Sequence, residues 1–330
     1  MPWNASDIPS QSGKTAIVTG GNSGIGLIAA RELARHGAAV TIACRDTGKG
    51  DAAVEKIRAD LGAAGTGAEV FVGKLDLASL DSVREFAEGF RANHGGGFDL
   101  LINNAGVMAP PRKTTADGFE LQFGTNHLGH FALTGLLFDL LAEKPGSRVV
   151  TVSSNAHKPG KINFDDLQSE QRYFRWKAYA QSKLANLVFS NELERRILVS
   201  GLDMKAVAAH PGYAKTNLST AGNSLGGDGI GGIFSTISGP FLKFGENLIG
   251  QDAEHGALPT LYAATVEGLA GGSYVGPDGI GEFRGHPVIV QGTGASQKLE
   301  TGERLWQVSE DLTGVTFPAI LKSGMANAAG

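Results

Sequence analysis

Short apolar runs rich in β-branched residues alternate with helix-like segments along the first 210 residues of this chain. The apolar runs lie at 15–19, 39–43, 69–73, 99–103, 148–153 and 205–210, and the helix-like segments lie at 25–36, 48–61, 79–93, 117–142 and 177–199. Strict alternation of strand and helix is typical of a parallel sheet with helices on both faces and right-handed crossovers. We therefore predict an α/β fold built on a doubly wound parallel sheet.

The alternation fails at 155–178 and at 217–250. The second segment mixes glycine and serine with more apolar residues than a solvated linker needs, namely Ile230, Ile233, Phe234, Ile237, Phe241, Leu242 and Phe244. It is interpreted as a lid over a pocket, with a mobile surface loop as the alternative. We predict a single domain over residues 1–330, with a core at about 14–210, the lid at about 217–250 and a C-terminal extension at about 276–330.

Charge and cysteine content exclude several classes of protein. The formal net charge is −4, and the 29 basic and 33 acidic residues are mixed along the chain, which gives no electrostatic footprint for nucleic acid or an anionic membrane. Cys44 is the only cysteine, so an internal disulfide and a cysteine-rich metal site are excluded. The N-terminus shows neither a signal peptide nor a membrane anchor, and we expect a cytoplasmic protein.

The segment TGGNSGIG at 19–26 follows the first predicted strand and opens the first predicted helix. Gly24-x-Gly26-x-x-Ala29 fits the fingerprint of a dinucleotide-binding loop, with Gly20 at the turn out of the strand. Glycines let the backbone approach a pyrophosphate, and the helix N-terminus supplies N–H donors and a favourable dipole. The sheet is therefore predicted to be of the Rossmann type, and its core is predicted to bind a dinucleotide cofactor.

The end of the second predicted strand bears on which dinucleotide is bound. A fold specific for NAD usually places an acid there, to hold the ribose 2′-hydroxyl. Here Ala43 and Cys44 occupy the strand end and Arg45 follows, which suits a 2′-phosphate. We predict NADP(H) as the preferred cofactor. Asp46 keeps NAD(H) as an alternative, and Arg45 could also be an ordinary exposed loop arginine.

Six motifs connect the chain with a known family: TGGNSGIG at 19–26, NNAG at 103–106, TNHLGHF at 125–131, VSS at 152–154, YAQSK at 179–183 and HPGYAKT at 210–216. On these motifs the chain resembles the short-chain dehydrogenase/reductase family. ACRD, NHLGHF and INFDDLQ make it similar to the branch that contains retinol dehydrogenases, WW-domain oxidoreductases and protochlorophyllide reductases. The segment between Ser154 and Tyr179 is longer than the family's commonest spacing, and Ala185 stands where protochlorophyllide reductases carry a cysteine.

The resemblance implies the roles of individual residues. It gives a catalytic set of Asn126, Ser154, Tyr179 and Lys183. Ser154 would hydrogen-bond the substrate oxygen, Lys183 would also hold the ribose hydroxyls, and Asn126 would help to position a water that relays protons to Lys183. With Arg45 added, the predicted cofactor-binding residues are Gly20, Asn22, Ser23, Gly24, Ile25, Gly26, Arg45, Asp76, Leu77, Asn104, Ala105, Gly106, Tyr179, Lys183, Pro211, Gly212 and Thr216.

The stretch YFRWKAYAQSK at 173–183 contains the spacing Tyr-x-x-x-Lys twice. Hydride reduction of a ketone leaves charge on oxygen, so a proton donor is needed, and a lysine one helical turn away could lower the pKa of a tyrosine. Tyr179 opens a long helical pattern that fixes Lys183, and small residues flank it. We therefore assign Tyr179 as the proton donor and Tyr173 as a packed or rim aromatic near the substrate.

Three further residues invite a chemical role. His127 and His130 suggest a metal site, but no acidic or cysteine partner stands at a recognisable spacing, so core or helix-surface histidines are favoured and no metal is predicted. Cys44 is expected to be a small packed residue, not a nucleophile.

These patterns together predict an NADP(H)-dependent oxidoreductase that interconverts a carbonyl and an alcohol on a small molecule. The apolar lid residues Phe234, Phe241 and Phe244 predict a bulky lipophilic substrate. The alternative from another class is a nucleotide-sensing module without turnover, although such a module has no need for all four catalytic residues. No nucleic-acid or membrane partner is expected, and the resemblance leaves a homo-oligomer open.

Overall fold

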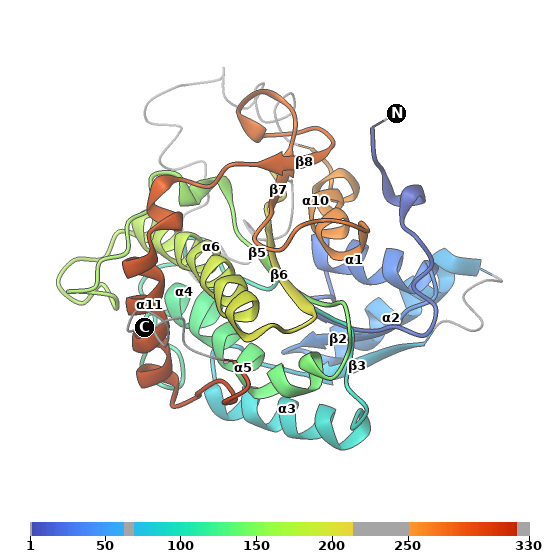
Figure 1. The fold of residues 1–330 in the computed structure, drawn as a ribbon, viewed down its shortest axis with the longest axis horizontal. Helices are drawn as coiled ribbons and strands as arrows, with labels where there is room; N and C mark the ends of the chain where they lie inside the picture. Colours follow the sequence, from blue (N-terminus) through green and yellow to red (C-terminus); the bar gives the residue numbers. More distant parts are fainter. Residues whose placement is uncertain (1, 63–68, 214–250, 322–330) are drawn as a thin grey trace.

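The computed structural model describes residues 2–62, 69–213 and 251–321 of the chain. A single eight-stranded sheet crosses these residues in the order β3-β2-β1-β4-β5-β6-β7-β8 (Figure 1). Its strands are β1 (Thr15–Thr19), β2 (Ala39–Cys44), β3 (Val70–Lys74), β4 (Leu100–Asn103), β5 (Ser147–Val152), β6 (Met204–Ala209), β7 (Tyr274–Pro277) and β8 (Pro287–Val290). Neighbouring strands are parallel except for β8, which is antiparallel to β7. The predicted doubly wound α/β fold is confirmed.

Helices cover both faces of this sheet. One face packs against α1 (Gly24–Arg35), α2 (Thr47–Leu61) and α10 (Ala253–Thr265), and the other packs against α3 (Leu80–Asn93), α5 (Gly129–Ala142) and α6 (Arg175–Ser200). Helix α11 (Leu299–Thr313) packs on α6 and α5. Successive side chains of a strand point to opposite faces. In β1, Ala16 and Val18 accordingly join the first core and Ile17 joins the second.

The six predicted strands lie within one residue of those observed, but the predicted helix at 117–142 was wrong as one element. It divides into α4 (Leu121–Phe123), a π-helical segment η3 (Gly124–Leu128) and α5. The Glu120 carboxylate accepts the N–H groups of Gln122 and Phe123 at 2.9 and 2.8 Å, which fixes the start of helix at residue 121. The described residues also form the short helices η1 (Ala5–Asp7), η4 (Asn155–His157), η5 (Ile280–Glu282) and η6 (Gly294–Gln297).

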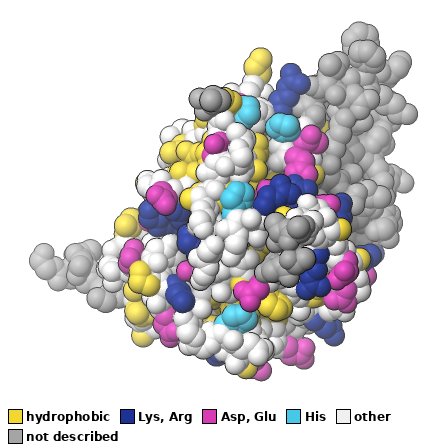
Figure 2. Space-filling view, turned by 90° about the vertical axis from the view of Figure 1, so that its right-hand side faces the viewer, with side chains coloured by type: hydrophobic (Ala, Val, Ile, Leu, Met, Phe, Trp, Pro, Cys, Tyr) yellow, Lys and Arg dark blue, Asp and Glu magenta, His cyan; other side chains and the backbone are white. Residues whose placement is uncertain are grey.

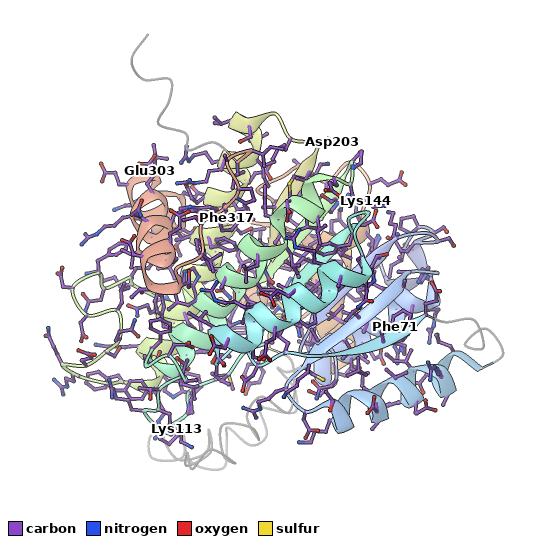
Figure 3. All side chains as sticks on the ribbon, turned by 90° about the horizontal axis from the view of Figure 1, so that it is seen from below. Phe71, Lys113, Lys144, Asp203, Glu303 and Phe317 are labelled. Atoms are coloured by element: carbon purple, nitrogen blue, oxygen red, sulfur yellow. The ribbon has the colours of Figure 1, made fainter. Side chains whose placement is uncertain are left out.

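The residues after 276, predicted as an extension, contribute to the sheet and to the second core. Strand β8 forms the edge of the sheet beside β7, and α11 packs along α6. Figure 3 shows Glu303 on the outer side of α11 and Phe317, just beyond this helix, on its inner side. The Phe317 ring lies 5.2 Å from that of Phe131 and 4.4 Å from that of Trp306, centroid to centroid. The predicted lid at 217–250, with Phe234, Phe241 and Phe244, lies outside the described residues.

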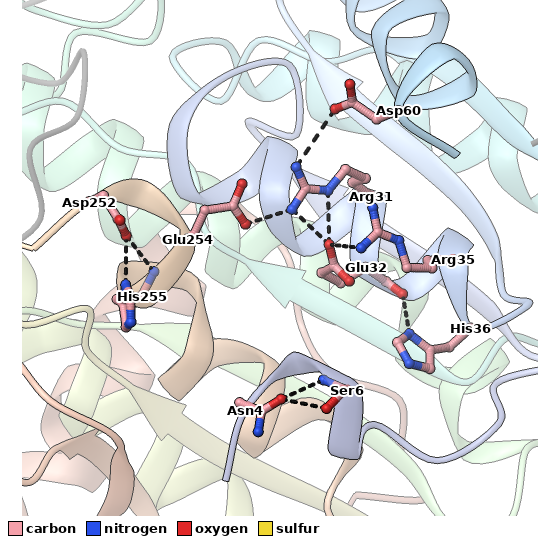
Figure 4. A network of polar contacts seen from close by, with 10 residues as sticks. All are labelled: Asn4, Ser6, Arg31, Glu32, Arg35, His36, Asp60, Asp252, Glu254 and His255. Atoms are coloured by element: carbon pink, nitrogen blue, oxygen red, sulfur yellow. Dashed lines mark hydrogen bonds and ion pairs between the residues drawn. The ribbon is translucent and has the colours of Figure 1, made fainter. Parts of the chain in front are cut away.

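A cluster of charges joins α1 to α10 (Figure 4). The Arg31 guanidinium contacts Glu32 at 2.7 Å, Asp60 of α2 at 3.6 Å, and Glu254 in the first turn of α10. Arg35 lies 3.4 Å from the same Glu32 oxygen. Because the Glu32 side chain is buried, it depends on these two arginines to compensate its charge. The cluster therefore holds the helix behind the glycine loop against the C-terminal part of the fold.

The surface carries charges of both signs. On the face shown in Figure 2, Lys and Arg side chains are interspersed with Asp and Glu. Among the helices in the described ranges, none is long and apolar enough to cross a bilayer.

Candidate active site

The glycine loop forms a tight cradle between β1 and α1. Gly20 has φ +65°, and a Cβ there would lie 3.1 Å from the Cα of Ala105. A Cβ on Gly26 would lie only 2.5 Å from the Asn104 side chain and the Gly20 carbonyl oxygen. Ser23 precedes α1 in an extended conformation, and its hydroxyl caps none of the described N–H groups of the first turn. Close backbone approach and available N–H donors are what a pyrophosphate group requires, so this cradle fits a dinucleotide.

The loop after β4 is fastened to the end of β1. The Asn104 side chain donates to the carbonyl of Thr19 at 2.8 Å, and the backbone N–H groups of Asn104 and Ala105 donate to the Thr19 hydroxyl at 2.9 and 3.0 Å. The structure thereby brings the predicted cofactor residues 104–106 beside Gly20 and Gly26, at the carboxyl ends of adjacent parallel strands. Ligands of open α/β sheets bind at this edge.

Two further strand ends contribute predicted cofactor residues. Arg45 is exposed directly after β2, while the Asp46 carboxylate accepts the Lys49 N–H at 3.1 Å as the N-cap of α2. After β3, the Asp76 carboxylate accepts the N–H of Ala78 at 3.0 Å, and Leu77 is buried. Asn22 and Ile25 lie within the glycine loop and the first turn of α1.

The four predicted catalytic residues lie at neighbouring positions at the same edge of the sheet. Tyr179 and Lys183 come from the N-terminal half of α6, and the Lys183 amine lies 5.9 Å from the centre of the Tyr179 ring. Ser154, two residues after β5, hydrogen-bonds the Tyr179 phenol. The Lys183 amine donates to the Val152 carbonyl at the end of the same strand, at 3.0 Å.

Asn126 lies in the π-helical segment η3, where its side chain is fully buried. The amide donates to the Val107 carbonyl at 3.0 Å and to the Ser182 hydroxyl at 2.9 Å, and its oxygen accepts the Val107 N–H at 2.8 Å. A Cβ on Gly106 would lie 3.0 Å from the Asn126 oxygen and 3.6 Å from the Lys183 amine. Asn126 therefore locks the loop after β4 beside the lysine. Single π-turns inside helices often mark functional sites.

Burial controls the ionisation of the tyrosine and the lysine. Burial raises the pKa of Tyr179 to about 12, against a smaller lowering by the Ser154 hydrogen bond. Burial also lowers the pKa of Lys183 to about 8. The sequence predicted that the Lys183 ammonium would lower the pKa of Tyr179, whereas in the protein alone burial raises it, because a buried phenolate is poorly solvated.

Tyr173 occupies a different place, in the loop before α6. Its hydroxyl donates to the Pro110 carbonyl at 2.8 Å and accepts from the Gln122 side-chain amide at 2.9 Å. Burial and Glu120 raise the pKa of Tyr173 to about 12. Its potential partner Lys177 is exposed and instead lies 4.9 Å from the centre of the Phe174 ring. The structure thus brings Tyr179, and not Tyr173, into contact with Ser154.

The turn after β6 borders the same group of residues. Gly212 has φ +65°, and a Cβ there would lie 2.5 Å from the Phe283 carbonyl oxygen. The Pro211 carbonyl accepts a hydrogen bond from the Gln251 side chain at 2.7 Å. Thr216 lies outside the described residues.

Sequence reasoning missed two residues at this site. Trp176 is partly exposed in the first turn of α6, and its ring centre lies 6.2 Å from that of Tyr179. Its position three residues before Tyr179 would have revealed it, had the helix been predicted to begin at residue 175 instead of 177. The second is His130, which lies buried between Asn126 and Thr19. The sequence offered no signal for its partners, because a histidine on an apolar helix is usually a core residue.

The fold and this site define a class of enzyme, the nicotinamide-dinucleotide-dependent oxidoreductases that act on alcohol and carbonyl groups. The family model of the short chain dehydrogenases matches residues 14–224, and the chain belongs to that family.

Similar proteins place it more closely within the family. Retinol dehydrogenase 12 of Homo sapiens is 43% identical over 305 residues, which cover 92% of this chain and 88% of the relative. Retinol dehydrogenase 13 of Homo sapiens is 43% identical over 309 residues, covering 93% and 87%. A crystal structure of an uncharacterised protein from Mycobacterium paratuberculosis superposes with a TM-score of 0.77 at 44% identity, covering 96% of this chain and all of that one. The chain accordingly falls in the retinol dehydrogenase-like branch.

Proposed function

We propose that this enzyme uses NADP(H) to interconvert a carbonyl and an alcohol on a bulky lipophilic substrate. The observation that carries the proposal is the meeting of Ser154, Tyr179, Lys183 and Asn126 beside the glycine cradle, at one edge of the sheet. Gly20, Gly26, Asn104 and Lys183 would hold the dinucleotide. When bound, the cofactor supplies or accepts the hydride.

The protein's own residues would handle the proton. Ser154 would hydrogen-bond the substrate oxygen, and Tyr179 would donate its proton to that oxygen as negative charge develops there. With a pKa of about 12, Tyr179 holds its proton at neutral pH, which suits reduction of the carbonyl. Oxidation needs the phenolate. Lys183 would accept and pass on protons near its pKa of about 8.

The preference for NADP(H) rests on the end of β2. Arg45 is exposed there, while the Asp46 carboxylate is engaged in capping α2. A guanidinium can make charge-assisted hydrogen bonds to a 2′-phosphate worth roughly 1.5 to 3 kcal/mol, or about 10- to 150-fold in binding. NADPH should therefore be used better than NADH.

Kinetics with both cofactors test this preference. Arg45→Ala should lower kcat/KM for NADPH by about 10- to 150-fold and leave NADH nearly unchanged. Arg58→Ala removes the same charge at the far end of α2 and should affect neither cofactor. Equal losses for NADPH and NADH in Arg45→Ala would mean that Arg45 supports its loop and does not bind the phosphate.

The lipophilic substrate is supported by the residues around Tyr179. Trp176 stands against Tyr179, and Phe283 is 43% exposed beside Gly212, so aromatic surface borders the site. The names of two similar relatives identify retinol, an apolar alcohol, as their substrate. A panel of ketones and aldehydes of increasing apolar size, retinaldehyde included, should show rising kcat/KM in nicotinamide absorbance assays. Activity confined to small polar carbonyls would contradict the proposal.

A further inference from the structure

His130 bridges two parts of the candidate site that no backbone hydrogen bond joins within the described residues. The imidazole is buried in the first turn of α5, one residue after that helix begins. Its Nδ1 lies 2.9 Å from the main-chain carbonyl oxygen of Asn126, and its Nε2 lies 2.9 Å from the Thr19 hydroxyl. One side chain therefore contacts the π-helical segment that carries Asn126 and the strand end that leads into the glycine loop.

The partners fix the proton on this imidazole. A carbonyl oxygen can only accept a hydrogen bond, so Nδ1 must carry the proton. Nε2 then has a lone pair that can accept the proton of the Thr19 hydroxyl at 2.9 Å, and it competes for this proton with the Ile102 carbonyl oxygen at 3.2 Å. Burial lowers the pKa of His130 to about 4, so the ring stays neutral at physiological pH and this tautomer is kept.

Thr19 continues the connection to the cofactor cradle. Its oxygen accepts the N–H groups of both Asn104 and Ala105, and donation of its own proton to His130 polarises that oxygen and strengthens both bonds. The chain of contacts runs from Asn126 through His130 and Thr19 to Asn104, whose side chain packs against Gly26.

We infer that His130 is a positioning residue that couples the cofactor cradle to the catalytic Asn126. The inference rests on the proposed catalytic role of Asn126. The imidazole sets the direction of the Asn126 carbonyl within the π-turn and holds the Asn104–Ala105 segment against the end of β1, so that the two move as one unit.

Two conservative variants separate the two contacts. The side-chain amide in His130→Asn would lie near the position of Nδ1. This variant should keep the hydrogen bond to the Asn126 carbonyl and lose the one with the Thr19 hydroxyl. The longer side chain in His130→Gln reaches toward the position of Nε2. This variant should keep the hydrogen bond with the Thr19 hydroxyl and lose the one with the Asn126 carbonyl. His130→Leu should lose both.

His127 provides a matched control. It is an equally buried histidine three residues earlier, whose pKa burial also lowers, to about 3, but its Nε2 contacts Ser309 of α11 at 2.9 Å and not Thr19. His127→Leu should match His130→Leu in loss of fold stability without affecting the cofactor cradle.

The first readout is amide hydrogen exchange of the cofactor-free protein at Asn104 and Ala105, whose N–H groups donate to the Thr19 hydroxyl. We expect exchange there to accelerate about 10- to 100-fold in His130→Leu and His130→Asn, and to stay near wild type in His130→Gln and His127→Leu. Equal acceleration in His127→Leu and His130→Leu would overturn the inference, since the effect would then be general loosening of the fold.

The second readout is kinetic. His130→Gln should lower kcat about 10-fold with little change in NADPH affinity, whereas His130→Asn should weaken NADPH binding and preserve kcat. The same loss in both parameters for both variants would also overturn the inference. Absence of any carbonyl turnover by the wild type would contradict the proposed function instead, and hydrogen exchange would still decide the role of His130.

Discussion

Tyr179 and Tyr173 have the same raised pKa, about 12, in different surroundings, and so they offer a test of function at the scale of one hydroxyl group. Tyr179→Phe deletes the proposed proton donor and little volume, so turnover should fall by at least about 100-fold while cofactor binding is retained. Tyr173→Phe removes the hydroxyl that donates to the Pro110 carbonyl, while the Gln122 amide keeps its bond to the Arg175 carbonyl, so the change should act mainly on the apparent KM. Steady-state kinetics and cofactor titration of both variants check this. The assignment is wrong if Tyr173→Phe is the inactive variant.

Lys183 is a candidate catalytic residue whose charged amine, because it is buried, lowers the free energy of unfolding. Its pKa falls from 10.5 to about 8 on folding, so the charged form is penalised by up to roughly 3 kcal/mol. Lys183→Met should abolish turnover but raise the free energy of unfolding at pH 6.5. The Val152 carbonyl keeps its bond from the Asn186 amide, at 3.1 Å, in this variant.

The pH dependence of this gain follows from linkage. Below pH 8 the lysine is charged in both the folded and the unfolded state, so burial of the charge lowers the free energy of unfolding by its full amount. Between pH 8 and 10.5 the folded protein loses the proton first, and the wild type gains stability relative to the variant. Urea unfolding at pH 6.5 and pH 10 should therefore show a shrinking difference. Exposed Lys177→Met is the control, and an equal difference at both pH values in Lys183→Met would refute the argument.

For single residues, the sequence allowed the candidate catalytic residues to be proposed, but it did not reveal the groups that they contact in the fold. Tyr179, Lys183, Ser154 and Asn126 could be proposed because each stands in a short motif that is recognisable in the sequence. The contacts of Thr19 and His130 could not, because they join strand β1 to helix α5, over a hundred residues apart in the chain, and only tertiary packing determines such a pair. The pKa of Tyr179 escaped prediction because burial is a property of the fold.

Among the helices and strands, the close packing of α1 against the loop after β4 constrains the site. Gly26→Ala would place a methyl group 2.5 Å from Asn104 and the Gly20 backbone, so we expect a destabilisation of about 1 to 3 kcal/mol and loss of cofactor binding. Gly89 lies in α3, and a methyl group added to it would meet nothing within 4 Å, so Gly89→Ala should stabilise the protein by about 0.5 to 1 kcal/mol. Urea titrations and cofactor fluorescence measure both effects, and effects of the same sign would contradict the packing argument.

Strands and helices differed in how well the sequence predicted them. Five of the six predicted strands, β1, β2, β4, β5 and β6, are buried on both faces, which leaves continuous apolar runs that are easy to recognise. The sixth, β3, lies at the edge and exposes Phe71. Strand β8 is short, lies at the edge, and exposes Val288 and Ile289, so it carries no such pattern. The π-helical segment depends on side-chain contacts of Asn126 and was predicted as ordinary helix.

For the molecule as a whole, the prediction of one domain implies one cooperative unfolding transition. Three tryptophans report on separate regions: the Trp3 ring lies 5.2 Å from that of Tyr262 of α10, Trp176 lies at the site, and Trp306 is a buried residue of α11. In variants that retain one tryptophan each, fluorescence and far-UV circular dichroism should give the same midpoint. A tryptophan that melts apart from the dichroism signal would show that its region forms a separate unit.

The pairing of α1 with α10 has a consequence for how the chain is made. Ala30 and Leu33 of α1 belong to the same apolar core as Ala257 and Leu261 of α10, and Arg31 pairs with Glu254. A ribosome adding about 5 to 20 residues per second needs roughly 10 to 50 seconds to proceed from one helix to the other. During that interval the nascent chain exposes the apolar face of α1, and Arg31 lacks its partner Glu254. Both lie next to the glycine loop that forms the cofactor cradle. Nascent chains halted before residue 250 should therefore be held by chaperones, and release should follow once α10 has left the exit tunnel.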